Sequence, residues 1–238
     1  MSDQSPRRRL ITQLQLPEHL AVTRAGLLWD RLLLGRLGVY IWLSRRIPSW
    51  TRGAEAVALA RRAYELEGAP VLVEVGSFLG ASALLLAGAR RLRGRGVVHC
   101  VDSFDGQGDA FSAPIYGAIL AGLGAPARRA FDQNLCRAGL TDWVRVHQGR
   151  AEEIGASWDQ PIDLLFLDGD QSYPGARAAF LVWSAHLRAG GLLAVHNSLS
   201  TDEHHDGARR VVAELVRPPA FGRAAVVGST TFALKGGR

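Results

Sequence analysis

Lysine, cysteine and methionine are scarce in this chain of 238 residues. Lys235 is its only lysine, and its two cysteines are Cys100 and Cys136. Neither cysteine belongs to a C-x-x-C pair or another metal-binding spacing, which excludes cysteine-ligated metal sites of that kind. Cys100 lies within an apolar run, where a buried free thiol is expected. This use of cysteine is typical of a reducing compartment, and we expect the protein to be cytoplasmic.

The sequence also lacks an uncharged apolar stretch long enough to cross a bilayer. Its most apolar segment, residues 25–43, is interrupted by Asp30, Arg31 and Arg36, so it is too short and too charged for a membrane span. The polar amino-terminal residues show no apolar core of a secretory signal. We expect residues 25–43 to form a helix that packs on the main domain or on a second subunit. Peripheral contact with a membrane surface and a cover over the active site are the alternatives.

Acidic side chains are the minority among the charged residues. The chain has 22 Asp and Glu against 28 Lys and Arg, which gives a formal net charge of +6. Almost all the basic residues are arginines, and they are scattered along the chain. Because a nucleic-acid-binding surface gathers its basic residues in one patch, we expect no nucleic-acid partner.

Apolar runs of strand length alternate with helical segments through most of the chain. Their continuous apolar character is typical of strands buried on both faces, and the alternation predicts a parallel, doubly wound α/β sheet. Two short runs joined by Gly228 and Ser229 predict a hairpin at the sheet edge. We expect a helical extension over residues 1–50 and one α/β domain over residues 51–238. The predicted strands are residues 71–75, 97–101, 143–147, 162–167 and 192–196, and the predicted helices lie near 80–92, 128–139, 174–188 and 206–216.

A glycine loop follows the first predicted strand, in the sequence VEVGSFLGAS. Gly76 and Gly80 allow the backbone to approach a ligand at the start of a helix. Asp102, at the end of the second strand, can accept hydrogen bonds from both hydroxyls of a ribose. The dinucleotide fingerprint needs a glycine where this chain has Ser77, whereas S-adenosylmethionine carries no phosphate and needs fewer close approaches. Glu74 favours a cationic ligand of that kind.

These features together resemble class I S-adenosylmethionine-dependent methyltransferases. Within that class, the sequence is similar to small-molecule O-methyltransferases related to macrolide-sugar methyltransferases and to cephalosporin-hydroxylase-like proteins. The similarity covers about residues 48–235. It rests on five motifs in the expected order, VLVEVGSFLGAS, VDSFDG, FDQNLCRAGLTDWVRVHQGRAEE, FLDGDQSYPGARAAFLVWSAHLRAGGLLAVHNS and VVGSTTFALKGG.

The resemblance implies a Rossmann-like sheet of seven strands whose last strand is antiparallel. It also implies a cofactor site in which the glycine loop wraps the methionine part, Asp102 holds the ribose and Asp168 lies beside the methyl group. The expected cofactor-binding residues are Glu74, Gly76, Ser77, Phe78, Gly80, Asp102, Ser103, Phe104, Arg150, Ala151 and Asp168.

The chain departs from its metal-dependent relatives near the expected methyl-transfer site. In those relatives an aspartate at the position of Asp168 binds a divalent cation, and the next strand supplies further ligands where this chain has His196 and Asn197. Asp168 and Asn197 can still offer oxygens to a cation such as Mg²⁺, but an imidazole suits softer metals. A metal site at Asp168 and Asn197 and a site without metal both remain open.

The identity of the base is a second departure. Relatives with a D-G-x-H pattern carry a histidine where this chain has Gln171, and an amide does not titrate. Histidine is the usual type of base near neutral pH. His196, at the end of a core strand, is our first choice, while His204 and His205 lie in a polar loop that can fold over the site. We expect His196, Asp168 and Gln171 to form the catalytic set.

The leading interpretation is a methyltransferase that moves a methyl group to a hydroxyl of a small natural product or sugar, working as a homo-oligomer and most simply as a dimer. An adenosylmethionine-binding partner protein with altered chemistry is the alternative, motivated by Gln171 and Asn197. A nicotinamide-dependent oxidoreductase is disfavoured by Ser77 and by the terminal hairpin. The insertion over residues 107–128 lies where relatives build a substrate cover, so we expect it to select the acceptor.

Overall fold

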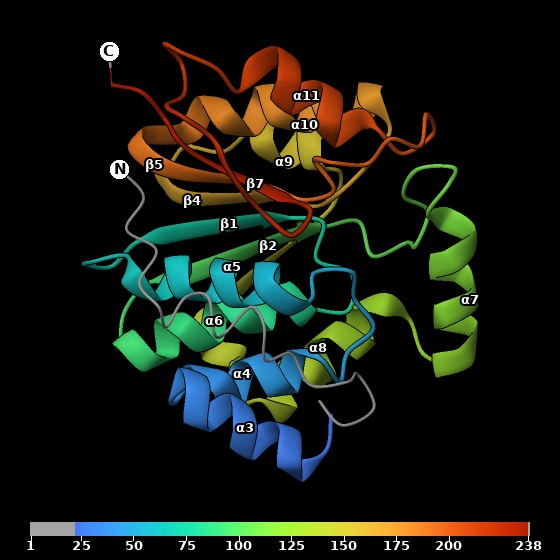
Figure 1. The fold of residues 1–238 in the computed structure, drawn as a ribbon. Helices are drawn as coiled ribbons and strands as arrows, with labels where there is room; N and C mark the ends of the chain where they lie inside the picture. Colours follow the sequence, from blue (N-terminus) through green and yellow to red (C-terminus); the bar gives the residue numbers. More distant parts are fainter. Residues whose placement is uncertain (1–21, 238) are drawn as a thin grey trace.

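A single sheet forms the centre of the molecule in a computed structural model that describes residues 22–237 (Figure 1). Its seven strands are β1 (Val71–Val75), β2 (Val97–Asp102), β3 (Val144–Gln148), β4 (Ile162–Leu167), β5 (Leu187–Val195), β6 (Ala225–Val227) and β7 (Thr230–Leu234). Their order in the sheet is β3-β2-β1-β4-β5-β7-β6. β1 to β5 pair in parallel, and β7 lies antiparallel between β5 and β6. The predicted doubly wound sheet with an antiparallel last strand is confirmed.

Helices cover both faces of this sheet, as Figure 1 shows. One layer contains α3 (Arg24–Leu34), α4 (Leu37–Ser44), α5 (Gly53–Glu65), α6 (Ala81–Arg93) and α8 (Ala127–Arg137). The opposite layer contains α9 (Ala151–Ala156), α10 (Tyr173–His186) and α11 (Gly207–Leu215). A short 3₁₀ helix, Thr141–Trp143, precedes β3, and α7 (Ala113–Leu123) stands apart at one end of the sheet. The four predicted helices correspond to α6, α8, α10 and α11 and are confirmed to within a few residues.

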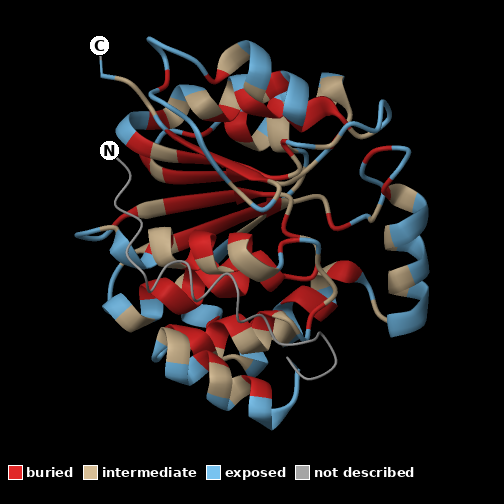
Figure 2. Ribbon diagram, in the orientation of Figure 1, coloured by how far each residue is buried: buried red, intermediate tan, exposed pale blue. Residues whose placement is uncertain are grey.

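The central strands are buried on both faces because their side chains alternate between two cores. Leu164 and Phe166 of β4 pack in the core under α5 and α6, whereas Leu165 and Leu167 pack in the core under α10. Figure 2 shows the resulting band of buried residues along the strands. Continuous apolar strands are what a parallel sheet covered on both faces requires.

The apolar segment 25–43 forms two helices, α3 and α4, rather than the single helix that we expected. Gly35 separates them with φ 60°, a conformation that glycine adopts without steric cost. Asp30 is buried and forms an ion pair with Arg45, just after α4, which explains a carboxylate in so apolar a segment. The first part of the expected N-terminal extension, residues 1–21, lies outside the described residues.

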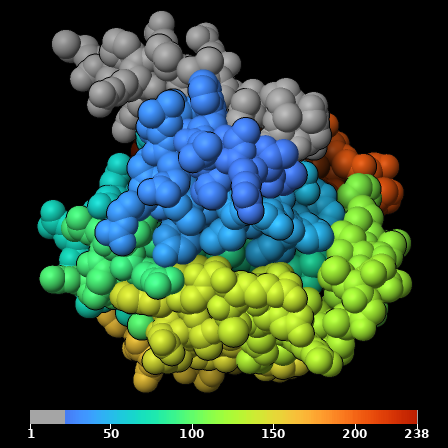
Figure 3. Space-filling view, turned by 90° about the horizontal axis from the view of Figure 1, so that it is seen from below, coloured from blue at the N-terminus to red at the C-terminus, as the bar shows by residue number. Residues whose placement is uncertain are grey.

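Packing of this segment on the main domain is confirmed for α4. The ring of Tyr40 lies against Gly88 of α6, where an added Cβ would be 2.3 Å from the ring. Leu28 and Leu32 of α3 are 67% and 76% exposed. Figure 3 shows α3 and α4 in blue on the face seen from below, with α7 in green at the edge. Among residues 22–237, none of the helices is both long and apolar enough to cross a membrane.

The carboxyl ends of the parallel strands meet at one edge. The Asp168 N–H donates to the Val75 carbonyl at 2.8 Å, and the Gly76 N–H donates to the Val101 carbonyl at 2.9 Å. At Gly76, φ is +89°, and an added Cβ would be 2.4 Å from the Asp168 carbonyl oxygen. Glycine is therefore required where the chain leaves β1 and passes the end of β4. In doubly wound sheets, ligands bind beyond this edge.

Candidate active site

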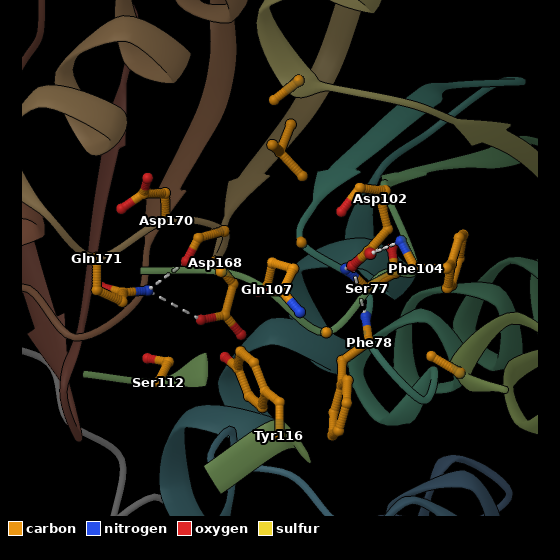
Figure 4. Close-up of a pocket in the computed structure, with 18 of the residues that line it drawn as sticks. Ser77, Phe78, Asp102, Phe104, Gln107, Ser112, Tyr116, Asp168, Asp170 and Gln171 are labelled. Carbon is orange, nitrogen blue, oxygen red and sulfur yellow. Dashed lines mark hydrogen bonds between the residues drawn. The ribbon is translucent and has the colours of Figure 1, made fainter. Parts of the chain in front are cut away.

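A cavity of about 340 Å³ opens at the carboxyl ends of the strands. Figure 4 shows side chains from the loop after β1, the end of β2, α7 and the segment after β4 arranged around it. It brings together most of the predicted site residues, namely Gly76, Ser77, Phe78, Asp102, Ser103, Phe104, Arg150, Ala151, Asp168, Gln171 and Asn197. As far as the described residues go, the lining leaves out Glu74, Gly80 and His196.

The Asp102 carboxylate fixes two loops of the cavity wall. Its Oδ2 accepts the backbone N–H groups of Ser77 and Phe78, each at 2.8 Å, and its Oδ1 accepts the Phe104 N–H at 2.6 Å. Phe78 and Phe104 have φ of 44° and 56°, a backbone conformation that residues other than glycine rarely adopt. The hydrogen bonds to Asp102 hold the backbone in these two turns. Burial raises the pKa of Asp102, and the three backbone bonds oppose that shift.

These bonds change what Asp102 offers to a ligand. A carboxylate has about four lone-pair sites, and backbone groups occupy three of them, so Asp102 cannot receive two ribose hydroxyls as freely as we expected. The same geometry bears on dinucleotides, because the N–H groups of Ser77 and Phe78 are turned to Asp102 and away from a pyrophosphate. The loop therefore favours a ligand without phosphate at this position.

Glu74 and Gly80 have places other than those predicted for direct cofactor contact. Glu74 is fully buried, and the Cys100 thiol lies 3.5 Å from its Oε2. Burial raises the pKa of Glu74 to about 7, which does not favour a fixed negative charge toward a cation. Gly80 is the residue before α6, with φ +86°, and Phe131 would be 2.9 Å from an added Cβ. Both residues lie outside the cavity lining and pack beneath the glycine loop. The geometry therefore does not favour the predicted direct contact of Glu74 and Gly80 with a ligand.

His196 lies behind Asp168 rather than in the cavity. Its side chain is 1% exposed. Its Nδ1 is 2.7 Å from Oδ1 of Asp168, and its Nε2 is 3.4 Å from Oε1 of Glu55 on α5. The other oxygen of Glu55 accepts the Ser229 N–H at 2.8 Å, the Ser229 hydroxyl at 2.9 Å and the Thr230 hydroxyl at 3.1 Å. Glu55, His196 and Asp168 thus form a row of ionisable groups that is buried at Glu55 and His196 and reaches the cavity at Asp168.

The two carboxylates next to His196 favour its protonated form. Burial alone would lower the pKa of His196, but the carboxylates of Asp168 and Glu55 together raise it to about 10. Burial likewise opposes ionisation of Glu55, yet His196 and Ser229 lower the pKa of Glu55 to about 2. His196 is therefore an imidazolium at neutral pH, with both N–H groups donated. This arrangement does not suit the general base that we expected at position 196.

The residues do not fit a divalent cation. Both ring nitrogens of His196 face carboxylates rather than the cavity, at 2.7 Å from Asp168 and 3.4 Å from Glu55. Asp168 also accepts from the Thr51 hydroxyl at 3.3 Å and from the Gln171 amide at 3.5 Å. Asn197 lines the cavity. It could add one amide oxygen to those of Asp168, which is fewer oxygen ligands than a divalent cation such as Mg²⁺ takes. Over the described part of the chain, no group of three or more His, Cys, Asp or Glu could hold a metal.

Gln171 is a fixed part of the wall. It is 4% exposed, and its Nε2 donates to the Gly169 carbonyl at 3.2 Å as well as to Asp168. Its backbone N–H donates to Asp109 at 3.3 Å, which ties it to the insertion before α7. Asp170 accepts the Ser172 N–H at 2.8 Å and shapes the turn before α10. Gln171 thus orients Asp168 and takes no proton itself.

The insertion supplies the opposite wall, as expected of a cover. It contributes Gln107, Phe111, Ser112, Ile115 and Tyr116 to the lining. The Tyr116 ring lies 4.6 Å from Phe78 and 5.4 Å from Trp50, measured between centroids. Figure 4 shows the Tyr116 hydroxyl pointing toward Asp168, and burial raises the pKa of Tyr116, so this hydroxyl stays protonated. The site therefore has an aromatic side next to a carboxylate.

Sequence reasoning missed three residues near Asp168. Glu55, in the first turn of α5, contacts His196, and Thr51, two residues before α5, donates to Asp168. Trp50 lines the cavity next to Thr51. The available signal was weak: Glu55 is an acid at the beginning of a mostly apolar helical stretch, and Trp50 and Thr51 follow the helix-breaking Pro48.

The chain is similar to methyltransferases in both sequence and structure. A family model described as a methyltransferase domain matches residues 73–198. The cofactor-bound protein Rv0187 from MTB is 22% identical, with 93% of this chain and 99% of that chain covered and a TM-score of 0.60. The O-methyltransferase TomG from Streptomyces achromogenes, involved in tomaymycin synthesis and in complex with SAM, is 20% identical, with coverages of 94% and 100% and a TM-score of 0.59.

A third solved structure is an O-methyltransferase from Bacillus cereus in complex with SAH. It is 19% identical, with 95% of this chain and 96% of that chain covered and a TM-score of 0.55. At such identities the likeness establishes a shared fold, and it extends over almost the whole chain.

Proposed function

The chain belongs to the methyltransferase domain family, and from this premise we propose that it transfers a methyl group from S-adenosylmethionine to a hydroxyl of a small molecule. The observation that carries the proposal is the cavity in which the glycine loop, Asp102 and Asp168 converge opposite an aromatic wall. A nucleoside ligand without phosphate suits the side of the cavity formed by the glycine loop and Asp102. A small acceptor with an apolar body suits the side formed by the aromatic wall.

The cofactor would be held chiefly by the lining residues that the loops present. Gly76 to Phe78 would contact its methionine part, Ser103 and Phe104 would border its adenosine, and Arg150 and Ala151 would edge the adenine ring. When bound, S-adenosylmethionine supplies an electrophilic methyl group on a positively charged sulfur. Asp168, which His196 contacts at 2.7 Å from the side away from the cavity, would place its carboxylate next to that cation.

Positioning would be the main contribution of the protein to the reaction. Holding an acceptor hydroxyl in line with the methyl carbon replaces a bimolecular encounter by an oriented one, which can supply several kcal/mol of the barrier. Asp168 can accept a hydrogen bond from the acceptor, and the protonated Tyr116 hydroxyl can donate one. Trp50 and Tyr116 would hold the apolar part of the acceptor away from water.

We include no divalent cation in this proposal. The donor set around Asp168 does not fit one, and the His196 imidazolium already provides a positive charge at 2.7 Å from the carboxylate. Methyl transfer is therefore expected to be the same within about twofold in EDTA and in added Mg²⁺. A loss of turnover in EDTA that Mg²⁺ restores would contradict this part of the proposal.

Calorimetry and turnover test the main proposal. We expect S-adenosylmethionine and S-adenosylhomocysteine to bind and NAD not to bind, and we expect methylation of at least one member of a panel of phenols, sugars and macrolides. Binding of NAD alone would overturn the proposal. Binding of S-adenosylmethionine without turnover of any acceptor would instead favour a partner protein that has lost its chemistry.

The proposal extends to the cell compartment and the assembly. A fully buried free thiol, Cys100, suits a reducing cytoplasm. The exposed side chains of Leu28 and Leu32 on α3 suit contact with a second copy of the chain, so we propose a homodimer. Light scattering would give twice the chain mass for the natural protein, and Leu32→Asp would lower it. A monomer at micromolar concentration would contradict the dimer.

A further inference from the structure

The loop between β5 and α11 brings a different histidine to the cavity. His205 lines the cavity and is half-buried, whereas its neighbour His204 is exposed and lies outside the lining. The His205 ring packs against the ring of Phe111, with centroids 4.8 Å apart and planes at 54°. This contact joins the loop after β5 to the insertion before α7, so the two segments close the acceptor side of the cavity together.

Backbone contacts fix the segment that carries His205. The Gly207 N–H donates to the Gln171 carbonyl at 3.0 Å, and an added Cβ on Gly207 would lie 2.4 Å from the Ser172 carbonyl oxygen. The turn before it is closed by the His205 N–H, which donates to the Asp202 carbonyl at 2.9 Å. His205 is therefore held two residues from a point of direct backbone contact with Gln171.

The insertion is tied to the same point. Asp109 is buried, and its Oδ2 accepts the Gln171 N–H at 3.3 Å while its Oδ1 accepts the Phe111 N–H at 3.0 Å. Asp109 thus links Gln171 to the residue whose ring contacts His205. Gln171, Phe111 and His205 form one connected unit at the rim of the cavity.

The polar side chains next to Asp168 are already engaged in other contacts. His196 carries two donated N–H groups, Gln171 is an amide, and burial raises the pKa of Tyr116. Asp168 already receives three donors. Within residues 22–237, by contrast, neither ring nitrogen of His205 has a hydrogen-bond partner, and the aromatic ring that it packs against is that of Phe111.

We propose that His205 is the general base that accepts the proton of the acceptor hydroxyl, a role that rests on the proposed methyl transfer. A lone pair on a His205 nitrogen takes the hydroxyl proton as the acceptor oxygen forms its bond to the methyl carbon. The carbon–sulfur bond breaks and its electron pair stays on sulfur. The products are a methyl ether, neutral S-adenosylhomocysteine and the His205 imidazolium, which releases its proton through its exposed side.

Chemical modification tests this assignment without turnover. In the native protein with S-adenosylhomocysteine present, diethyl pyrocarbonate is expected to modify His205 and to leave His196 intact, as read by peptide mass spectrometry. The His204→Gln variant removes the neighbouring site so that the assignment of the label is unambiguous. A His205 that stays unmodified while exposed His204 reacts in the parent protein would overturn the proposal.

Kinetics test the role itself. With any acceptor that the natural protein methylates from the phenol, sugar and macrolide panel, His205→Gln is expected to lower kcat by about a hundredfold or more, with cofactor affinity within twofold. His204→Gln serves as the matched control and is expected to keep kcat within twofold. Added imidazole is expected to restore part of the activity of His205→Ala. An unchanged kcat in His205→Gln would remove His205 from the mechanism.

The two hypotheses fail in different ways. If the natural protein binds S-adenosylmethionine but methylates nothing, the proposed function fails, and the labelling of His205 still decides whether its ring is a free base in the cavity. If the natural protein is active and the His205 variants match it, the function stands and the base assignment is wrong.

Discussion

The Nδ1 atom of His196 lies 2.7 Å from Oδ1 of Asp168, while its Nε2 faces Glu55 at 3.4 Å. A histidine at the end of a core strand is thus a fixed cation between two carboxylates. Asp168 meets the cavity from one side and this cation from the other. The position of the Asp168 carboxylate in the cavity therefore depends on its contact with His196, a buried side chain that a ligand in the cavity does not touch.

Removing this cation is expected to destabilise the protein. In His196→Asn the neutral side chain leaves the buried Glu55 and the partly exposed Asp168 without their shared counter-charge, and removing one partner of a buried ion pair costs about 3–5 kcal/mol. Urea unfolding would measure the loss. His204→Asn, which changes an exposed histidine in a loop, is the control and is expected to alter the free energy of unfolding by less than about 0.5 kcal/mol. Equal stability of the two variants would show that this row of ionisable groups contributes little.

Stability should also depend on pH through the same group. Because the folded-state pKa of His196 is raised to about 10 from 6.5, its contribution is fully present below pH 6.5 and is lost as pH rises through 10. The lowered pKa of Glu55 acts in the opposite direction, with stability present above 4.5 and lost as pH falls through about 2. The free energy of unfolding should decline between pH 6.5 and 10, and this decline should be absent in His196→Asn. The same decline in the natural protein and in His196→Asn would show that other ionisable groups cause it.

Asp102→Asn is expected to weaken cofactor binding. An amide nitrogen would replace one of the oxygens that accept the Ser77, Phe78 and Phe104 N–H groups, so two donors would face each other and the loops would shift. Loss of a hydrogen bond to a charged acceptor costs about 1.5–3 kcal/mol, and we expect the Kd for S-adenosylmethionine to rise about 10–100-fold. Calorimetry measures it, with the exposed Asp159→Asn as control. An unaltered Kd would mean that the loops hold their shape without this carboxylate.

Gly76→Ala tests the close approach of β1 to β4. The added Cβ would lie 2.4 Å from the Asp168 carbonyl oxygen at φ +89°, so we expect about 2–5 kcal/mol of destabilisation from overpacking and backbone strain together. Gly94→Ala is a matched control, since Gly94 has φ +74° and nothing within 4 Å of an added Cβ. It should cost only the strain, about 1–2 kcal/mol. A Gly76 variant no worse than the Gly94 variant would show that the two loops can separate without loss.

Local pattern was enough to predict the sheet. Mostly apolar runs marked β1, β2, β3 and β4 to within a residue, because strands covered on both faces contain few polar residues. The segment 25–43 shows where a pattern is insufficient: its apolar residues predict helix throughout, but Gly35 turns the chain between two helices.

The candidate site was predictable only where a strand end fixed the position of a residue. Asp102, Asp168 and the glycine loop follow strands directly, and all reach the cavity. His196 also follows a strand, but side chains alternate between the two faces of a sheet, and its side chain turns toward Glu55. That partner is 141 residues distant in sequence, so the contact exists only in the tertiary structure. The place of His205 was equally hidden, since it depends on the Gly207–Gln171 contact.

The helix α7 has a consequence for how such an enzyme can diversify. It contains no buried residue, yet Ile115 and Tyr116 on it line the cavity. Substitutions on a surface element change stability little, so variation in α7 can alter which acceptor is held while the two cores, the Asp102 loops and the row of ionisable groups stay intact. Selection for a new substrate and selection for a durable fold act here on separate stretches of the chain.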